Sequence, residues 1–265
     1  MRILILLSTI LILAGCSHAL PAEQALPVAD IEVEDIIDPV VEVESLEDLL
    51  IKDKERLLPE VLPKISDPII EPAPTSKKIP ATHDQNVTFV SQSPYATWDD
   101  LHQEACEEAS MIMVVRHFEN QALDKAIMEE EIQKFVVWQA ENGYDIDVTA
   151  GEVKEIMKTY FNYEVEVTGD VTVDRIKQEL AAGKLIIVPA AGRELGNPYF
   201  TQPGPLYHML VIRGYDRNQF ITNDPGTRRG ARYKYKYQTV INAVHDWNDG
   251  DVENGKKLMV LVSPN

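Results

Sequence analysis

One stretch, Trp98 to Phe118 with the sequence WDDLHQEACEEASMIMVVRHF, constrains the fold most, because it places a cysteine where a polar loop becomes an apolar segment. The residues after Cys106 are too apolar for a solvated helix, so a helix buried on most sides is predicted. Glu107 and Glu108 suit its first turn, where free N–H groups and the helix dipole favour negative charge. The same dipole lowers the pKa of a thiol there, which makes Cys106 a candidate nucleophile.

The length of 265 residues and the apolar content of 45% allow one large domain or two small ones. The formal net charge of −18 argues against a nucleic-acid partner and against binding anionic lipid by charge alone. Two cysteines form at most one disulfide. Four of the histidines show no metal-ligand spacing and are interpreted as surface or structural residues: His83, His102, His117 and His245. No metal or cofactor is therefore expected.

The first 16 residues, MRILILLSTILILAGC, have one basic residue and an apolar run too short for a comfortable membrane span. This pattern predicts a secretory signal. Its end, LAGC, resembles the lipobox of bacterial lipoproteins, in which the cysteine carries lipid and becomes the mature N-terminus. We therefore expect lipidation of Cys16 and an extracytoplasmic, membrane-anchored protein; an ordinary signal peptide or an uncleaved anchor is the alternative. A lipidated Cys16 cannot pair with Cys106.

Residues 17–85 are predicted to be an acidic, proline-rich tether. The part up to residue 80 holds nine of the 16 prolines, and proline and like-charge repulsion both oppose compact folding. A short amphipathic helix is possible over Ser45 to Leu58. A spacer between membrane and domain is favoured over a partner-binding segment. The folded domain is assigned to residues 86–265.

Within that domain, helical patterns precede a series of strand patterns. Further helices are predicted over Ala122 to Gln139, Thr149 to Phe161, Thr172 to Ala182 and Thr239 to Asp246. Strands are predicted over Val87 to Gln92, Tyr163 to Val167, Lys184 to Ala190, Tyr233 to Tyr237 and Lys257 to Val262. Thr149 and Glu152 match a capping box. This order predicts an α+β fold with helices packed on a mainly antiparallel sheet.

A hairpin is predicted from Leu206 to Tyr215, a turn at Asp216 to Asn218, and a second strand from Gln219 to Thr222. His208 opens the first strand, and Asp224 follows the second within NDPG. The hairpin would bring both side chains to the same end of the sheet.

A thiolate nucleophile needs a base to take its proton and a third group to orient that base. Cys106, His208 and Asp224 supply these three types. Each also has a plainer interpretation: a small core cysteine, a core histidine and an ordinary Asp-Pro-Gly turn.

The domain resembles the C39-like group of papain-type cysteine peptidases. The resemblance covers roughly residues 86 to 262 and is carried by SQSPYATWDD (91–100), CEEASMIMV (106–114), YHMLVIRGYD (207–216) and NDPG (223–226). It implies a papain-like fold, with Cys106 as nucleophile, His208 as general base and acid, and Asp224 orienting the imidazole. The family's oxyanion-stabilising glutamine matches Gln92 best, with Gln103 as the rival.

One departure concerns Glu107 and Glu108, since many relatives follow the cysteine with Gly-Pro. Negative charge beside a thiol opposes thiolate formation, and the penalty is small only if both carboxylates point to solvent. The sequence therefore leaves open how readily the Cys106 thiol ionises.

We expect a monomeric thiol hydrolase that cleaves a peptide or isopeptide bond in a peptide or cell-envelope polymer. A transglutaminase-like acyl transferase and a non-catalytic envelope-binding module are the alternatives. The loop from Ala191 to Pro205 is expected to determine substrate specificity. The YKYKY segment, preceded by Arg228, Arg229 and Arg232, is interpreted as a solvated strand face rather than a ligand site.

Overall fold

The computed structural model describes residues 78–264 of the chain. The predicted signal peptide, Cys16 and the tether up to residue 77 lie outside the described residues. Between residues 78 and 264, no helix is both long enough and apolar enough to cross a membrane.

Four helices make up the first half of the described chain: α2 (Asp100–Glu104), α3 (Cys106–Phe118), α4 (Lys125–Glu141) and α5 (Ala150–Thr159). The predicted buried helix is confirmed, and α3 begins at Cys106 itself. The predicted capping box is also confirmed, because the Thr149 side chain accepts from Glu152 N while the Glu152 carboxylate accepts from Thr149 N. Side-chain caps of this kind satisfy N–H groups that a helix start leaves free.

The second half supplies most of a seven-stranded antiparallel sheet with the order β2-β7-β3-β4-β5-β6, in which β1 pairs with β4. The strands are β1 (His83–Asp84), β2 (Val165–Thr168), β3 (Leu185–Ala191), β4 (Tyr207–Tyr215), β5 (Gln219–Asn223), β6 (Tyr233–Lys236) and β7 (Met259–Val262). Two further helices, α6 (Val173–Ala181) and α7 (Tyr237–Ala243), and two short 3₁₀ turns, η2 (Gly192–Leu195) and η3 (Val252–Asn254), lie between strands. The α+β prediction is confirmed.

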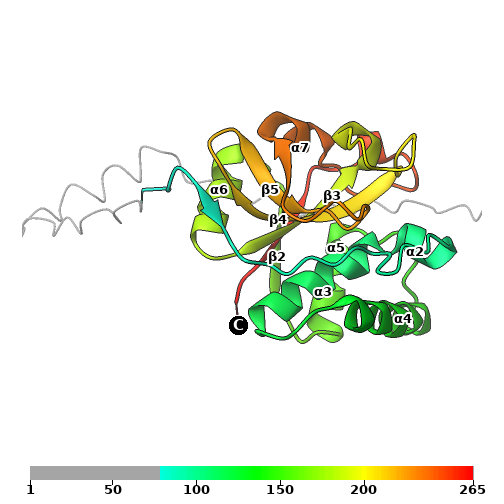
Figure 1. Cartoon of the computed structure of the whole chain (residues 1–265). Coiled ribbons are helices and arrows are strands. Elements are labelled where there is room, and N and C mark those ends of the chain that lie inside the picture. Colours follow the sequence, from blue (N-terminus) through cyan, green and yellow to red (C-terminus); the bar gives the residue numbers. More distant parts are fainter. Residues whose placement is uncertain (1–77, 265) are drawn as a thin grey trace, which may run out of the picture. The chain divides into compact units, whose positions relative to one another are not determined.

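Helices cover both faces of the sheet (Figure 1). Residues alternate along β4: Met209 and Val211 belong to the core shared with α3 and α5, whereas Leu210 and Ile212 belong to the core shared with α6 and α7. A strand buried on both faces needs a continuous apolar run, which explains the sequence HMLVI.

The predicted hairpin is confirmed, because β4 and β5 pair antiparallel through Val211–Asn223 and Tyr215–Phe220. Its turn is held by Asp216, whose Oδ1 accepts hydrogen bonds from the backbone N–H groups of Asn218 and Gln219.

The predicted strand from Val87 to Gln92 is wrong, since this segment forms no strand. Its backbone groups bond elsewhere. The Val87 carbonyl accepts from the Arg213 and Asn223 side chains, and Gln92 N donates to Pro225 O. The first strand instead lies earlier, at β1, before the predicted domain start.

Candidate active site

Cys106 is buried at the first position of α3, with its sulfur facing β4. Because β5 ends at Asn223, opposite Val211, the backbone N–H of Met209 lies beyond the last β4–β5 pair. That N–H donates to Cys106 Sγ at 3.3 Å. The thiol itself donates to Glu107 Oε2 at 2.9 Å. The start of α3 and the end of β4, which has no partner strand on its β5 side, together fix the position of the sulfur.

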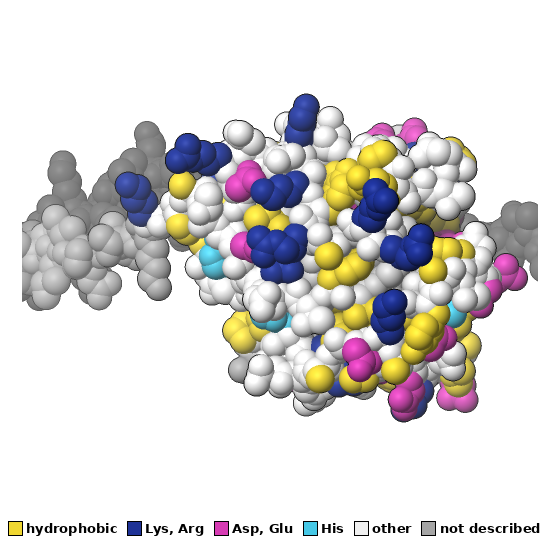
Figure 2. Space-filling model, in the orientation of Figure 1, with side chains coloured by type: hydrophobic (Ala, Val, Ile, Leu, Met, Phe, Trp, Pro, Cys, Tyr) yellow, Lys and Arg dark blue, Asp and Glu magenta, His cyan; other side chains and the backbone are white. Residues whose placement is uncertain are grey.

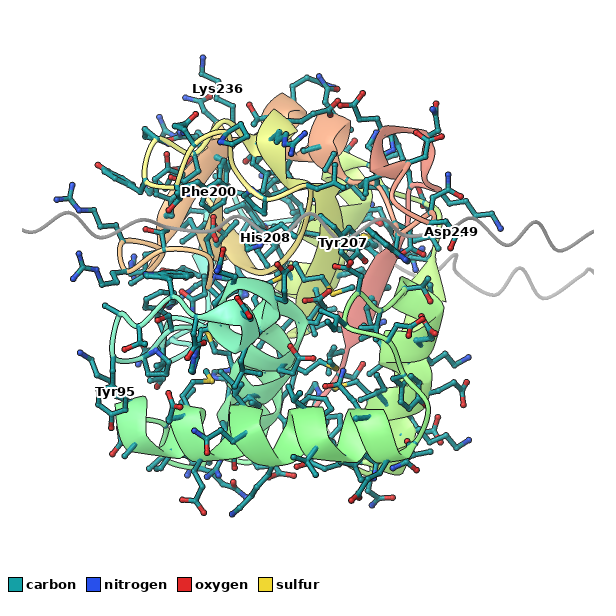
Figure 3. All side chains as sticks on the ribbon, turned by 90° about the vertical axis from the view of Figure 1, so that its right-hand side faces the viewer. Tyr95, Phe200, Tyr207, His208, Lys236 and Asp249 are labelled. Carbon is teal, nitrogen blue, oxygen red and sulfur yellow. The ribbon has the colours of Figure 1, made fainter. Side chains whose placement is uncertain are left out.

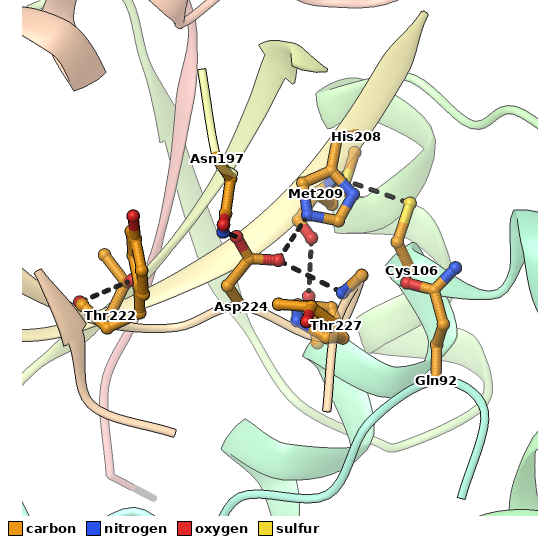
Figure 4. Close-up of polar contacts among 12 residues, drawn as sticks. Gln92, Cys106, Asn197, His208, Met209, Thr222, Asp224 and Thr227 are labelled. Atoms are coloured by element: carbon orange, nitrogen blue, oxygen red, sulfur yellow. Dashed lines mark hydrogen bonds and ion pairs between the residues drawn. The ribbon is translucent and has the colours of Figure 1, made fainter. Parts of the chain in front are cut away.

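His208 and Asp224 meet at the end of the hairpin, as the sequence predicts. His208 Nε2 lies 2.8 Å from Asp224 Oδ1, and both side chains are at most 1% exposed. The other ring nitrogen, Nδ1, is turned toward Cys106 (Figure 4). The three side chains therefore lie in the order sulfur, imidazole, carboxylate.

The Asp224 carboxylate accepts hydrogen bonds from three groups in addition to the imidazole. Oδ2 accepts from Tyr235 Oη at 2.5 Å and from Asn197 Nδ2 at 3.0 Å, while Oδ1 also accepts from Gly226 N at 3.1 Å. Burial raises the pKa of Asp224, but the His208 charge and the hydrogen bonds from His208, Tyr235 and Asn197 outweigh burial and lower that pKa below its ordinary value. Asp224 is therefore an anion with a fixed orientation.

Sequence reasoning missed both Tyr235 and Asn197. Tyr235 is 3% exposed, whereas Lys234 and Lys236 beside it are exposed, so β6 has one buried face rather than being a wholly solvated strand. The alternation in YKYKY carried that signal, because a tyrosine on the apolar face of a strand commonly needs a buried partner for its hydroxyl. Asn197 lies in a loop and gave no comparable signal.

Gln92 and Gln103 occupy different environments. Gln92 is 2% exposed and lies beside Cys106 (Figure 4), and its Nε2 donates to the backbone carbonyls of His102 and Gln103. Its Oε1 is buried without a hydrogen-bond partner among the described residues. The exposed Gln103 side chain donates to Trp98 O at 3.4 Å. Of the two, Gln92 is the one fixed next to the sulfur.

Two hydrogen bonds to one backbone carbonyl position Gln92. Gln92 N and Ser91 Oγ both donate to Pro225 O, at 3.1 Å and 3.0 Å, so the segment before α2 is tied to the loop that carries Asp224. The SQ and NDPG motifs, more than 130 residues apart, thus form one unit around His208.

The imidazole is enclosed by close neighbours. Phe200 meets it edge to face, with ring centroids 5.3 Å apart. A Cβ on Gly226 would lie 2.8 Å from His208 Cε1, so only glycine fits there without displacing the ring. The close approach of the His208 ring, as well as the turn, therefore explains why NDPG ends in glycine.

Glu107 and Glu108 do not point to solvent, because they are only 1% and 2% exposed. Burial and the charge of Glu108 raise the pKa of Glu107 well above its ordinary value, and burial raises the pKa of Glu108 to about 7. Burial, followed by the charge of Glu107, raises the pKa of the Cys106 thiol, while the Met209 N–H opposes that rise. The resting site therefore holds a thiol.

A groove with a volume of about 770 Å³ opens at the His208 side of the site. It is lined on one side by the loop from Phe200 to Leu206, and on the other by Trp98, Glu104 and Asp147. Figure 3 looks onto this region, with Phe200, Tyr207 and His208 at its centre. The loop predicted to carry specificity does line the groove, through its second half. The described residues contain no group of three or more His, Cys, Asp or Glu side chains able to hold a metal ion.

The basic and aromatic segment around β6 lies on another face, where Lys and Arg side chains are interspersed with apolar ones (Figure 2). Several of its cations have partners: Arg232 pairs with Asp84 at 2.8 Å, Lys234 pairs with Asp216 at 3.0 Å, and Arg229 stacks on Tyr199. These contacts give the basic residues a structural role.

A sequence model described as the Peptidase_C39 like family matches residues 84–249. Among solved structures, one assigned as a C39-like peptidase from Bacillus anthracis is 16% identical, with a TM-score of 0.45, over 69% of this chain and 98% of that one. Xylellain, a cysteine protease from Xylella fastidiosa, is 14% identical, with a TM-score of 0.37, over 77% of this chain and 95% of that one. No curated protein matches the sequence.

Proposed function

We propose, from the premise that this chain belongs to the C39-like family of cysteine peptidases, that it is a thiol hydrolase acting through Cys106, His208 and Asp224. The observation that carries this proposal is the alignment of Figure 4, in which Asp224 Oδ1 contacts His208 Nε2 at 2.8 Å while Nδ1 is turned toward Cys106. The substrate bond is a peptide or isopeptide bond.

In the proposed reaction, His208 Nδ1 takes the Cys106 proton, and the thiolate attacks the substrate carbonyl carbon. The imidazolium then gives that proton to the departing amine, which leaves an acyl group on Cys106. Water, deprotonated by His208, attacks the thioester and releases the acid and the free thiol. Asp224 accepts the Nε2–H throughout, so it fixes the tautomer and stabilises the imidazolium.

We assign the oxyanion to Gln92 rather than Gln103. The Gln92 side chain lies beside Cys106 (Figure 4), and its Nε2 donates to two backbone carbonyl oxygens. In the proposed complex, the substrate oxygen replaces one of those two acceptors. An amide donor in this place stabilises the negative charge that develops on the substrate oxygen.

The groove favours substrates with a basic side chain. Its lining includes two carboxylates, Glu104 and Asp147, and no Lys or Arg. Burial and the charge of Glu104 raise the pKa of Asp147 to about 6, so it is mainly ionised at pH 7. Trp98 and Ile146 in the same lining are exposed large apolar side chains, suited to the methylene stem of Lys or Arg.

We assign the protein to the extracytoplasmic side of a bacterial membrane, anchored by lipid on Cys16, on the strength of the LAGC motif after an apolar run. Expression of Cys16→Ala tests this assignment: the variant is expected to lack the lipid mass and to leave the membrane fraction. Recovery of a lipid-modified, membrane-bound variant would contradict it.

The activity is tested with a mixture of synthetic peptides, analysed by mass spectrometry. Cys106→Ala should lower turnover by at least about 10⁴-fold, as removal of a nucleophile does in other triads. Cys16→Ala, the matched control for the second cysteine, should cleave as the wild type does. Full cleavage by Cys106→Ala would exclude the proposed nucleophile.

A further inference from the structure

Glu107 contacts the sulfur of Cys106 directly. Its Oε2 lies 2.9 Å from Sγ, and its side chain is 1% exposed. The second oxygen, Oε1, is buried and has no hydrogen-bond partner within residues 78–264. A buried carboxylate normally has a cation or several N–H donors to stabilise its charge.

The titratable groups around Glu107 are acids. Cys106 and Glu108 flank it on α3, Asp147 approaches from the segment before α5, and Tyr207 approaches from β4. Tyr207 Oη in turn contacts Asp246 Oδ1 at 3.3 Å. Burial opposes a negative charge on Glu107 most strongly, and the charges of Glu108 and Asp147 oppose it further, which outweighs the hydrogen bond that the Cys106 thiol donates to the carboxylate. A carboxyl group in such surroundings keeps its proton.

A protonated carboxyl group is a hydrogen-bond donor. We propose that Glu107 is a neutral carboxylic acid that donates its O–H to the Cys106 thiolate, and that ionisation of Glu107 switches the nucleophile off. This inference rests on the proposed function, in which Cys106 attacks the substrate.

The proton balance is simple. The thiol proton moves to His208 Nδ1. The Glu107 carboxyl group, whose Oε2 accepts from the thiol in the resting site, keeps its own proton and turns its O–H toward the sulfur anion. The thiolate then has two donors, Glu107 Oε2–H and Met209 N–H. When the sulfur bonds to the substrate carbon, its charge disappears and the hydrogen bond from Glu107 weakens. No oxidant, metal or additional base takes part.

This role explains how a Glu-Glu pair can follow the nucleophile. Two ionised carboxylates would oppose thiolate formation, whereas a neutral Glu107 favours it by a charge-assisted hydrogen bond. Glu108 contributes indirectly, because its negative charge raises the pKa of Glu107. Glu107 is thus the residue that sets the upper pH limit for the thiolate.

The test measures the rate at which iodoacetamide alkylates Cys106 between pH 5 and pH 10, with the modified site identified by peptide mass mapping. Four proteins are compared: wild type, Glu107→Gln, Glu107→Ala and Glu108→Gln. Alkylation needs a thiolate but no substrate, so the readout does not depend on peptidase turnover. Thermal unfolding shows whether each variant is folded. The infrared band of a protonated carboxyl group, present in the wild type and absent from Glu107→Gln, reports the protonation of Glu107 independently of the alkylation rates.

For the wild type we expect the rate to pass through a maximum and then to fall as Glu107 ionises. Glu107→Gln keeps an N–H donor and cannot ionise, so its alkaline fall should vanish while its rate at the wild-type maximum stays within about threefold. Glu107→Ala loses the donor and should react about tenfold more slowly there. Glu108→Gln, the matched control, should keep the fall but at lower pH, because the repulsion that raises the Glu107 pKa is gone.

Two results would overturn the inference. If Glu107→Gln reacts tenfold or more faster than the wild type at neutral pH, Glu107 is an anion. If Glu107→Gln and Glu107→Ala both show the same dependence of alkylation rate on pH as the wild type, Glu107 only packs against the sulfur. A different result, reaction of wild-type Cys106 no faster than in the denatured chain at every pH, would overturn the proposed function itself and this inference with it.

Discussion

Tyr235 Oη donates a 2.5 Å hydrogen bond to Asp224 Oδ2, on the side of the carboxylate opposite to His208. Asn197 Nδ2 contacts both groups, at 3.0 Å from Asp224 and 2.8 Å from Tyr235. The carboxylate that faces the imidazole is therefore oriented by β6 and by the loop that carries Asn197, and not only by the hairpin.

Tyr235→Phe removes one donor from the buried Asp224 anion, and we expect a loss of about 1.5–3 kcal/mol in the free energy of unfolding at pH 7. The native pKa of Asp224 lies below its ordinary value, so its stabilising contribution is present at neutral pH and is lost as the pH falls through the native pKa. Without the Tyr235 hydroxyl that pKa rises. The acid limbs of stability and activity should therefore move to higher pH, as measured by urea unfolding and by kcat/KM.

Tyr233→Phe is the matched control, because Tyr233 is on the same strand and packs against the Tyr235 ring. It should leave both acid limbs in place. An equal effect of the two substitutions would show that ring packing, and not the bond to Asp224, accounts for the loss.

Gly226→Ala tests the enclosure of His208. The added methyl group would lie 2.8 Å from His208 Cε1 and 3.0 Å from Phe200 Cε1, so the imidazole must move. We expect kcat/KM to fall at least tenfold, about 1.4 kcal/mol, with the fold retained in thermal unfolding. Gly151→Ala is the control, since the nearest atom to its added carbon is 3.7 Å away. Unchanged kcat/KM in Gly226→Ala would mean that the imidazole position is not critical.

Gln92→Ala and Gln103→Ala separate the two oxyanion candidates. Gln92 is fixed beside the sulfur, so its loss should lower kcat by about 10²-fold to 10³-fold with a small change in KM. Gln103 is exposed, and its replacement should change kcat less than threefold. Steady-state kinetics measure both, and the reverse order of effects would exchange the assignments.

The negative charge of the groove predicts that a peptide with Lys is cleaved faster than one with norleucine at the same position. The ratio of kcat/KM for the two peptides measures this preference. Asp147→Asn or Glu104→Gln should each lower the preference for Lys by roughly fivefold, about 1 kcal/mol, without affecting cleavage of the neutral peptide. Raised salt should weaken the preference in the wild type. Glu155→Gln removes an equal charge at an exposed position of α5 and should change neither substrate's cleavage. An undiminished preference in both groove variants would refute the proposed subsite.

The sequence was sufficient to predict the hairpin, because the apolar run in β4, the Asp216 turn and the position of NDPG are local features. The meeting of His208 with Asp224 follows from that hairpin. The helix start at Cys106 was likewise predictable from the change between polar and apolar residues. The roles assigned to Cys106, His208 and Asp224 stay predictions.

The missed features depend on contacts between distant segments. Gln92 was assigned to a strand, yet its backbone bonds to Pro225 from the far end of the sequence. The burial of Glu107 and Glu108 also follows from tertiary packing, since charged residues in a first helical turn are usually solvated. Asn197 lies in a loop whose path no local pattern specifies.

Formation of a covalent acyl intermediate on Cys106 can be observed directly by rapid mixing. Wild-type protein is mixed with a cleaved peptide, quenched in acid within milliseconds, and examined by intact mass measurement and peptide mapping. We expect a mass increase equal to the acyl part of the substrate, located on Cys106 and absent from Cys106→Ala. Turnover with the acyl group on another residue, or undiminished turnover by Cys106→Ala, would contradict it.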